Sequence, residues 1–191
     1  MERPYAILLV LGCVVSIALV TAGMWLPRSW YRAIFYPGGR PSWLTGRLNS
    51  AWGRFHALGV LPSFLVSLEA KGRRTGKVSS RPMVVAEVGG ERYLVSMLGE
   101  KVDWVQNVRA ANGEAVLRHG TVERVTLEEI PVAERAPILK AYVARAPGGR
   151  PHFDVPSNAP LSAFDRIAVR YPVFRVRAQS TQHVDLAVDS R

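Results

Sequence analysis

The chain has 191 residues, which is enough for one domain with a hydrophobic core and too few for two domains of ordinary size. Its 25 Lys and Arg residues outnumber 15 Asp and Glu residues, and the net charge of +10 favours anionic partners such as nucleic acid, acidic lipid or a polyanionic cofactor. The single cysteine, Cys13, excludes a disulfide framework within the chain and a cysteine-based metal site.

A long uncharged segment lies near the amino terminus. Residues 4–27 carry no charged side chain and are mostly apolar, which meets the roughly 20 residues that a transmembrane helix needs, so we expect a membrane anchor over residues 1–27. Five arginines follow between residues 28 and 54, whereas Arg3 alone precedes the segment. The positive-inside rule therefore predicts a single-pass protein of the cell membrane with a cytoplasmic carboxy-terminal domain. A cleaved signal peptide is the alternative, but no A-x-A-like site follows the segment.

Residues 28–60 have the composition of a juxtamembrane connector, with the breaker Pro37-Gly38-Gly39 in its first half. Ser42 to Leu58 has the spacing of a short amphipathic helix. The apolar positions of this expected helix are Trp43, Leu44, Leu48, Trp52 and Phe55. Such a helix would either pack on the following domain or lie on lipid, so membrane lipid is an expected partner.

Residues 61–178 are expected to form the folded domain, because runs of β-branched and aromatic residues alternate there with turn signals. The expected strands are Ser63 to Ala70, Ser79 to Val88, Arg92 to Leu98, Glu114 to His119, Thr121 to Leu127 and Pro172 to Arg177. The expected helices are Glu100 to Ala111, Ile130 to Arg145 and Leu161 to Val169. This pattern predicts a mainly β domain with flanking helices, followed by a loose polar tail over residues 179–191.

The first two expected strands are joined by a basic turn, GRRTGK. No acidic residue interrupts its cations, so their positive potentials add. The glycines let the backbone turn tightly and expose N–H groups, which together with hydroxyl donors suit a phosphate or carboxylate ligand. The residues of this predicted anion site are Arg73, Arg74, Thr75, Lys77, Ser79 and Arg81. A solvated hairpin tip is the alternative interpretation.

A series of segments extends this motif: GRRTGK, Arg81-Pro82, GGERYLV and WVQNVRAANGEAVLRHG. Their order and spacing resemble the deazaflavin-dependent nitroreductase family over Phe55 to Arg177. Members are split β-barrel oxidoreductases, a fold shared with FMN-binding proteins, and they use the deazaflavin coenzyme F-420. One departure is Val78-Ser79, where members usually carry Pro-Arg. We expect Arg81, two residues further along the same strand face, to replace the missing arginine.

The resemblance implies hydride transfer from the reduced deazaflavin to a quinone, a nitro compound or an activated enone, with the coenzyme's anionic tail on the basic turn. Gly99 would let the planar ring approach the backbone, and Trp104 and Asn107, three residues apart on one helix face, would complete the cleft. The implied coenzyme-binding residues are Arg73, Arg74, Thr75, Lys77, Ser79, Arg81, Ser96, Met97, Gly99, Trp104 and Asn107. On the acceptor side we expect Tyr142, His152 and Phe153, which lie on the helix and loop that would cover the ring.

Other chemistries lack their motifs, because the sequence contains no G-x-G-x-x-G after a strand, no metal-ligand cluster and no G-x-S-x-G elbow. A cofactor that carries the reaction explains this shortage, and no residue is assigned as catalytic acid or base. The membrane anchor favours a quinone as acceptor, since tethering raises encounters with a bilayer-soluble molecule. Two alternatives stay open: an FMN-dependent enzyme and a non-catalytic cofactor- or lipid-binding protein. A second copy of the chain, in a homodimer, is a candidate partner. Nucleic acid is not an expected partner, because the arginines are dispersed and no RNP-like aromatics accompany them.

Overall fold

The structure is a computed structural model that describes residues 14, 18, 27–37, 42, 56–59 and 61–179. The predicted anchor over residues 1–27, most of the predicted helix from Ser42 to Leu58 and the tail beyond residue 179 lie outside the described residues. Among the residues that are described, no helix has the length and apolar character needed to cross a membrane.

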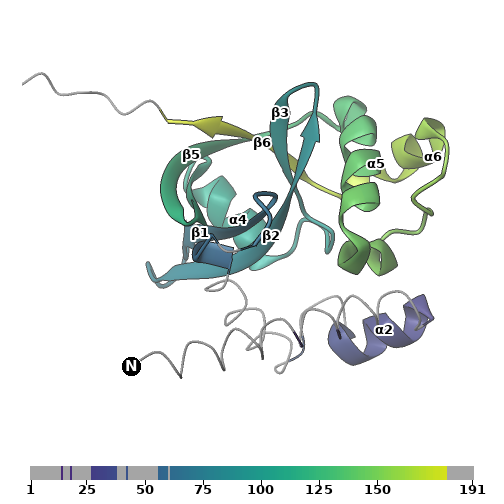
Figure 1. Cartoon of the computed structure of the whole chain (residues 1–191), viewed down its shortest axis with the longest axis horizontal. Helices are drawn as coiled ribbons and strands as arrows, with labels where there is room; N and C mark the ends of the chain where they lie inside the picture. Colours follow the sequence, from purple (N-terminus) through teal and green to yellow (C-terminus); the bar gives the residue numbers. More distant parts are fainter. Residues whose placement is uncertain are drawn as a thin grey trace, which may run out of the picture.

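Six antiparallel strands form a closed barrel in the described part of the chain (Figure 1). They are β1 (Leu65–Lys71), β2 (Val78–Val88), β3 (Glu91–Val95), β4 (Glu114–His119), β5 (Thr121–Glu129) and β6 (Val173–Ala178). Their order around the barrel is β1-β2-β3-β6-β5-β4, and the pairing of β1 with β4 closes it. The predicted mainly β domain with flanking helices is therefore confirmed, and the last expected strand, β6, lies between β3 and β5.

Neighbouring residues of β2 and β3 belong to two different hydrophobic cores, because successive side chains of a strand point to opposite faces. Val85 and Leu94 pack inside the barrel with residues of the four remaining strands. Ala86 and Tyr93 pack on its outside, under the helices α5 (Arg135–Arg145) and α6 (Leu161–Ile167). Figure 1 shows these two helices together on one side of the barrel. The barrel wall is thus buried on both faces at this side.

The helix α4 (Asp103–Ala110) contributes Val105 and Val108 to the core inside the barrel. It begins three residues later than the expected helix from Glu100 and ends at Ala110. Asn112 and Gly113 follow shortly after, and their positive φ angles of 51° and 87° prevent its continuation, as their residue types indicated. α5 also begins later than the expected helix from Ile130, at Arg135, so that Pro137 falls in the first turn, where a missing N–H costs nothing.

Two further elements were not anticipated. The proline-rich segment after α5 contains a 3₁₀ helix, η3 (Pro147–His152). The connector contains a helix, α2 (Arg28–Phe35), which packs against η3. A guanidinium N–H of Arg32 donates a hydrogen bond of 2.7 Å to the carbonyl oxygen of His152. Figure 1 shows α2 alongside the helical side of the barrel, so the start of the connector is part of the domain.

Candidate functional site

The basic turn between β1 and β2 is held by its own backbone. The N–H of Gly72 donates to the carbonyl of Lys77 at 2.9 Å, and the N–H of Gly76 donates to the carbonyl of Gly72 at 2.8 Å. Gly76 has a φ of +69°, which favours glycine. The Thr75 hydroxyl accepts a hydrogen bond from the Lys77 N–H at 3.3 Å, so it stabilises the turn. Arg74 and Lys77 are exposed, and neither forms an ion pair within the described part of the chain.

Arg73 has a different environment from the other cations of the turn. Its guanidinium donates to Oδ1 of Asn107 at 2.9 Å, and its backbone N–H donates to the same oxygen at 3.1 Å. The guanidinium also pairs with Asp103 at 3.1 Å. Asn107 is 5% exposed. Two residues that were predicted to bind the coenzyme therefore contact each other, and together they fasten the basic turn to α4.

Ser79 and Arg81 lie on the face of β2 that continues into the barrel interior, since they pair with Ala70 and Leu68 of β1 and both of these residues belong to the interior core. The expected common face of Ser79 and Arg81 is confirmed by this register. The Ser79 hydroxyl donates to the Ala70 carbonyl at 3.4 Å. Arg81 is half-buried and reaches only the neighbouring carbonyl of Ser80, at 3.5 Å, among the described residues. Its replacement of the family arginine stays a prediction.

The loop after β3 is a tight turn from Ser96 to Gly99. The Ser96 hydroxyl donates to the Gly99 carbonyl at 2.6 Å, and the Gly99 N–H donates to the Ser96 carbonyl at 3.1 Å. Gly99 has a φ of +83°, and a Cβ atom there would lie 3.3 Å from the carbonyl oxygen of Arg170. Glycine is thus required at this position by the chain's own backbone. Met97 and Leu98, at the tip of the loop, are half-buried.

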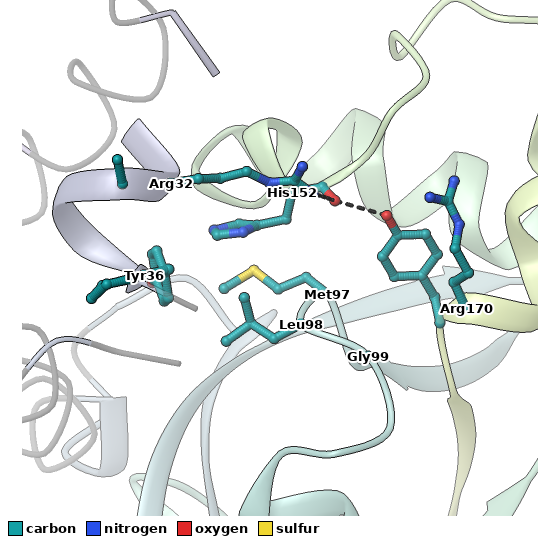
Figure 2. Close-up of a pocket in the computed structure, with 10 residues that line it drawn as sticks. Arg32, Tyr36, Met97, Leu98, Gly99, His152 and Arg170 are labelled. Carbon is teal, nitrogen blue, oxygen red and sulfur yellow. Dashed lines mark hydrogen bonds between the residues drawn. The ribbon is translucent and has the colours of Figure 1, made fainter. Parts of the chain in front are cut away.

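A pocket of about 500 Å³ opens between this loop, α2 and η3 (Figure 2). It is lined by Arg32, Ala33, Tyr36, Pro37, Met97, Leu98, Gly99, His152, Arg170 and Tyr171. The pocket brings together Met97 and Gly99, which were predicted for the coenzyme ring, and His152, which was predicted for the acceptor side. A ring-and-acceptor site at this place stays a prediction.

Three other predicted site residues do not line the pocket: Phe153 and Tyr142 are packed in a core, and the half-buried Trp104 packs against one. Phe153 is 0% exposed and lies with its ring centroid 4.4 Å from that of Tyr171. Tyr142 is also buried, and its hydroxyl lies 3.8 Å from the Met97 sulfur, so it supports the loop from behind. Trp104 packs edge-on against Phe174 at 5.4 Å, on the interior core of the barrel. Trp104 contacts Phe174 and Asn107 contacts Arg73, and their shared cleft stays a prediction.

The pocket also contains charged residues that sequence analysis did not single out. Asp154 lies between two guanidinium groups, 3.6 Å from Arg32 and 2.6 Å from Arg170. One carboxylate thus faces two cations, and the mouth of the pocket keeps a positive excess. Arg32 comes from α2 and Arg170 from the end of the 3₁₀ helix η4 (Ala168–Arg170), so no local sequence pattern could have joined them.

His152 is the buried polar residue of the pocket wall. It is 2% exposed, and the ring of Tyr36 packs edge-on against it at a centroid distance of 4.4 Å. Its backbone carbonyl accepts hydrogen bonds from Arg32 at 2.7 Å and from the Tyr171 hydroxyl at 2.8 Å. Burial, and secondarily the charge of Arg32, lowers the pKa of His152 to about 4. The imidazole is therefore neutral at physiological pH.

The basic turn and the pocket fit one elongated anionic ligand. Arg73 of the turn is bonded to Asp103, which lies only four residues after Gly99, so the chain from this tether to the pocket loop spans at most about 14 Å. The exposed cations of the turn suit an acidic tail, and the aromatic and methionine walls of the pocket suit a planar ring system. Side chains of the described residues thus fit a coenzyme with both features.

Comparison with known proteins shows the family of the chain. Residues 47–152, more than half of the chain, match the family model "F420H(2)-dependent quinone reductase". No curated protein matches the chain. Among solved structures, an F420-H2 dependent reductase is 22% identical with a TM-score of 0.42, over 62% of this chain and 97% of that one. A 5-nitroimidazole antibiotic resistance protein from Bacteroides thetaiotaomicron is 13% identical with a TM-score of 0.42, over 66% and 79% of the two chains.

The family match spans the basic turn, the loop from Ser96 to Gly99, α4 and His152. It selects the deazaflavin coenzyme over the FMN alternative and catalysis over simple binding. The chain therefore belongs to the F420H2-dependent quinone reductase family and is a reductase that uses the deazaflavin coenzyme F-420.

Proposed function

We propose that the protein is a membrane-anchored enzyme that passes a hydride from reduced F-420 to a quinone, and that the quinone occupies the pocket between α2 and the loop from Ser96 to Gly99. The observation that carries this proposal is the position of α2. This helix begins directly after the predicted anchor, and its residues Arg32 and Ala33, with Tyr36 just after its end, form one wall of the pocket. A segment at the membrane would then build the site that receives a membrane-soluble acceptor.

The outer face of α2 supports contact with a bilayer. Tyr31 is buried against the domain, whereas Trp30 and Ile34 are 65% and 53% exposed. These two apolar residues are four positions apart and lie on one side of the helix. A tryptophan and an aliphatic side chain exposed on one face are typical of a helix lying in the membrane interface. The arginines that follow the anchor favour a domain on the cytoplasmic side.

The coenzyme, when bound, supplies the hydride. The residues of this chain bind, orient and shield the reactants. Arg74 and Lys77 would hold the acidic tail, and the loop from Ser96 to Gly99 would present its backbone to the ring. The positive excess from Arg32 and Arg170 stabilises negative charge that develops on the acceptor's oxygens. Nitro compounds and activated enones accept the same hydride, but an anchor offers them no advantage, whereas it concentrates the enzyme beside a quinone in the bilayer.

The test uses the full chain in phospholipid vesicles. Deletion of the residues before Ser42 would remove the anchor and the pocket wall together, so point substitutions separate the two effects better. We expect the double variant Trp30→Glu, Ile34→Glu to reduce a long-chain quinone several-fold more slowly than the wild type. Its rate with a water-soluble short-chain quinone should stay within about twofold, because the substituted side chains do not line the pocket.

A matched control is Val122→Glu, which places a charge at an equally exposed apolar residue of β5. If the double variant reduces the long-chain quinone at the wild-type rate, the membrane-facing role of α2 is excluded. Failure of every quinone to oxidise reduced F-420 in the presence of the wild-type protein would exclude quinone reduction itself.

A further inference from the structure

We propose that His152 positions the acceptor, with Nε2 of its imidazole donating a hydrogen bond to a carbonyl oxygen of the quinone. This inference rests on the proposed quinone reduction and names the residue that recognises the substrate. His152 then acts as the polar contact of an otherwise largely apolar pocket, of the kind that fixes the orientation of a small ligand.

One nitrogen of the His152 imidazole is unsatisfied within the part of the chain that the structure describes. Nε2 of His152 is fully buried and has no hydrogen-bond partner among the described residues. Buried polar groups in folded proteins almost always have a partner, so an exception calls for an explanation. Figure 2 shows the imidazole close to Met97 and on the side of the pocket that α2 covers. Because Nε2 has no accessible surface, a ligand in the pocket would supply the missing acceptor by displacing the flexible side chain of Met97, which lies beside the ring.

His152 is held rigidly by its neighbours. The carbonyl of His152 is held by Arg32 and by the Tyr171 hydroxyl, and its ring is held edge-on by Tyr36 at 4.4 Å and by Tyr31 at 5.7 Å. These contacts come from α2 and from the end of η4, on two sides of the residue. A hydrogen-bonding group that is already fixed loses little entropy when it binds, which is the condition for precise positioning.

The other polar groups of the pocket have partners. Arg32 and Arg170 both bind Asp154, and the Tyr171 hydroxyl donates to the His152 carbonyl. The imidazole is neutral, since burial and the nearby Arg32 lower its pKa to about 4. A neutral imidazole donates one hydrogen bond and keeps its proton, as a carbonyl ligand requires.

The role fits the electron and proton balance of the reaction. A hydride brings two electrons to the quinone, one π bond of a carbonyl opens onto its oxygen, and one proton from water then completes the hydroquinone. His152 neither gains nor loses a proton in this sequence. Its hydrogen bond strengthens as the oxygen becomes negative, so it lowers the barrier as well as orienting the ring.

The test compares His152→Phe with His152→Gln in the full chain, in detergent or vesicles, with menadione as the quinone. We expect His152→Phe to lower kcat/KM for menadione by roughly 10- to 100-fold, because a buried hydrogen bond to a charged oxygen is lost. His152→Gln keeps an N–H donor and should recover most of that loss. The affinity for F-420, measured by fluorescence, should stay within about twofold for both variants.

The control is His56→Phe. His56 is also buried, and burial also lowers its pKa, but it contacts the Val66 carbonyl of β1 and does not line the pocket. This variant should keep its kcat/KM for menadione. A second measurement needs no substitution of His152: in protein labelled with ¹⁵N-histidine, menadione added without coenzyme should shift the Nε2 resonance of His152 and leave that of His56 unchanged.

The outcomes separate this inference from the proposed function. Menadione rates of His152→Phe equal to those of the wild type, or an Nε2 resonance that menadione does not move, would overturn the role of His152 and leave quinone reduction intact. If no quinone oxidises reduced F-420 in the presence of the wild-type protein, both the role of His152 and quinone reduction are overturned.

Discussion

Oδ1 of Asn107 accepts two hydrogen bonds from Arg73, one from the guanidinium at 2.9 Å and one from the backbone N–H at 3.1 Å. This single amide oxygen joins the basic turn between β1 and β2 to α4. Because α4 follows directly after the loop that lines the pocket, the same contact sets the distance between the two halves of the proposed coenzyme site. Asn107 thus has a precise role that differs from the predicted contact with the ring.

Asn107→Ala should weaken coenzyme binding and lower the free energy of unfolding together. The variant removes the acceptor of two partly buried hydrogen bonds, and we expect a loss on the order of 1–3 kcal/mol in stability. Asn107→Asp keeps the oxygen and should behave close to the wild type. Thermal unfolding and fluorescence titration with F-420 measure the two effects, with Gln106→Ala as a control on the same helix. Wild-type affinity in Asn107→Ala would show that the turn does not need this tether.

The double variant Arg74→Ala, Lys77→Ala should bind F-420 far more weakly. Both side chains are exposed and lack ion pairs within the described chain, so their charge is available to a ligand. Each well-formed charge-assisted contact is worth on the order of 1.5–3 kcal/mol. Titrations at increasing salt should show a smaller salt dependence in the variant. Arg124→Ala removes a similarly exposed charge from β5 and should leave the affinity unchanged, whereas an equal loss there would indicate a general effect of net charge.

Gly99→Ala should destabilise the protein more than Gly90→Ala does. Both glycines have positive φ angles, +83° and +78°, so each substitution carries a similar strain of about 1–2 kcal/mol. A Cβ at position 99 also meets the Arg170 carbonyl at 3.3 Å, whereas nothing lies within 4 Å of one at position 90. We expect only Gly99→Ala to lower the rate of menadione reduction. Equal melting temperatures for the two variants would argue against a tight approach at Gly99.

Stability should fall as the pH drops from about 6.5 towards 4, through the protonation of His152. Its pKa is lowered from 6.5 to about 4 in the folded protein, mainly by burial, so the unfolded chain binds more protons than the folded chain in this window. The contribution is complete above pH 6.5 and amounts to about 3 kcal/mol at most. It is measured as the difference in melting temperature between wild type and His152→Gln at each pH.

That difference should shrink steadily as the pH falls through the window. The comparison stays above pH 4.5, because the paired carboxylates Glu123 and Glu129 have lowered pKa values and lose their own contributions only below that range. A difference independent of pH would show that His152 is not buried in its neutral form.

The barrel itself was predictable because its signals are local. Alternating β-branched residues, the GRRTGK turn and the Gly89-Gly90 hairpin are each carried by a few neighbouring residues of the sequence. They predicted the strands, and the structure has a strand at each expected place. The order of the motifs along the chain, rather than any one residue, supported the resemblance to deazaflavin-dependent enzymes. These local sequence features do not depend on how the segments pack against one another.

The pocket depended on tertiary structure. His152 meets Arg32 across 120 positions of sequence, and the two approach each other only because α2 folds back on η3. Trp104, Tyr142 and Phe153 have the residue types of a ligand site, yet Tyr142 and Phe153 are packed in a core and Trp104 packs against one. An aromatic side chain has the same chemistry at a site and in a core, so its role is decided by which face of the barrel the helices cover. That choice comes from burial between distant segments, which acts only after the barrel has closed.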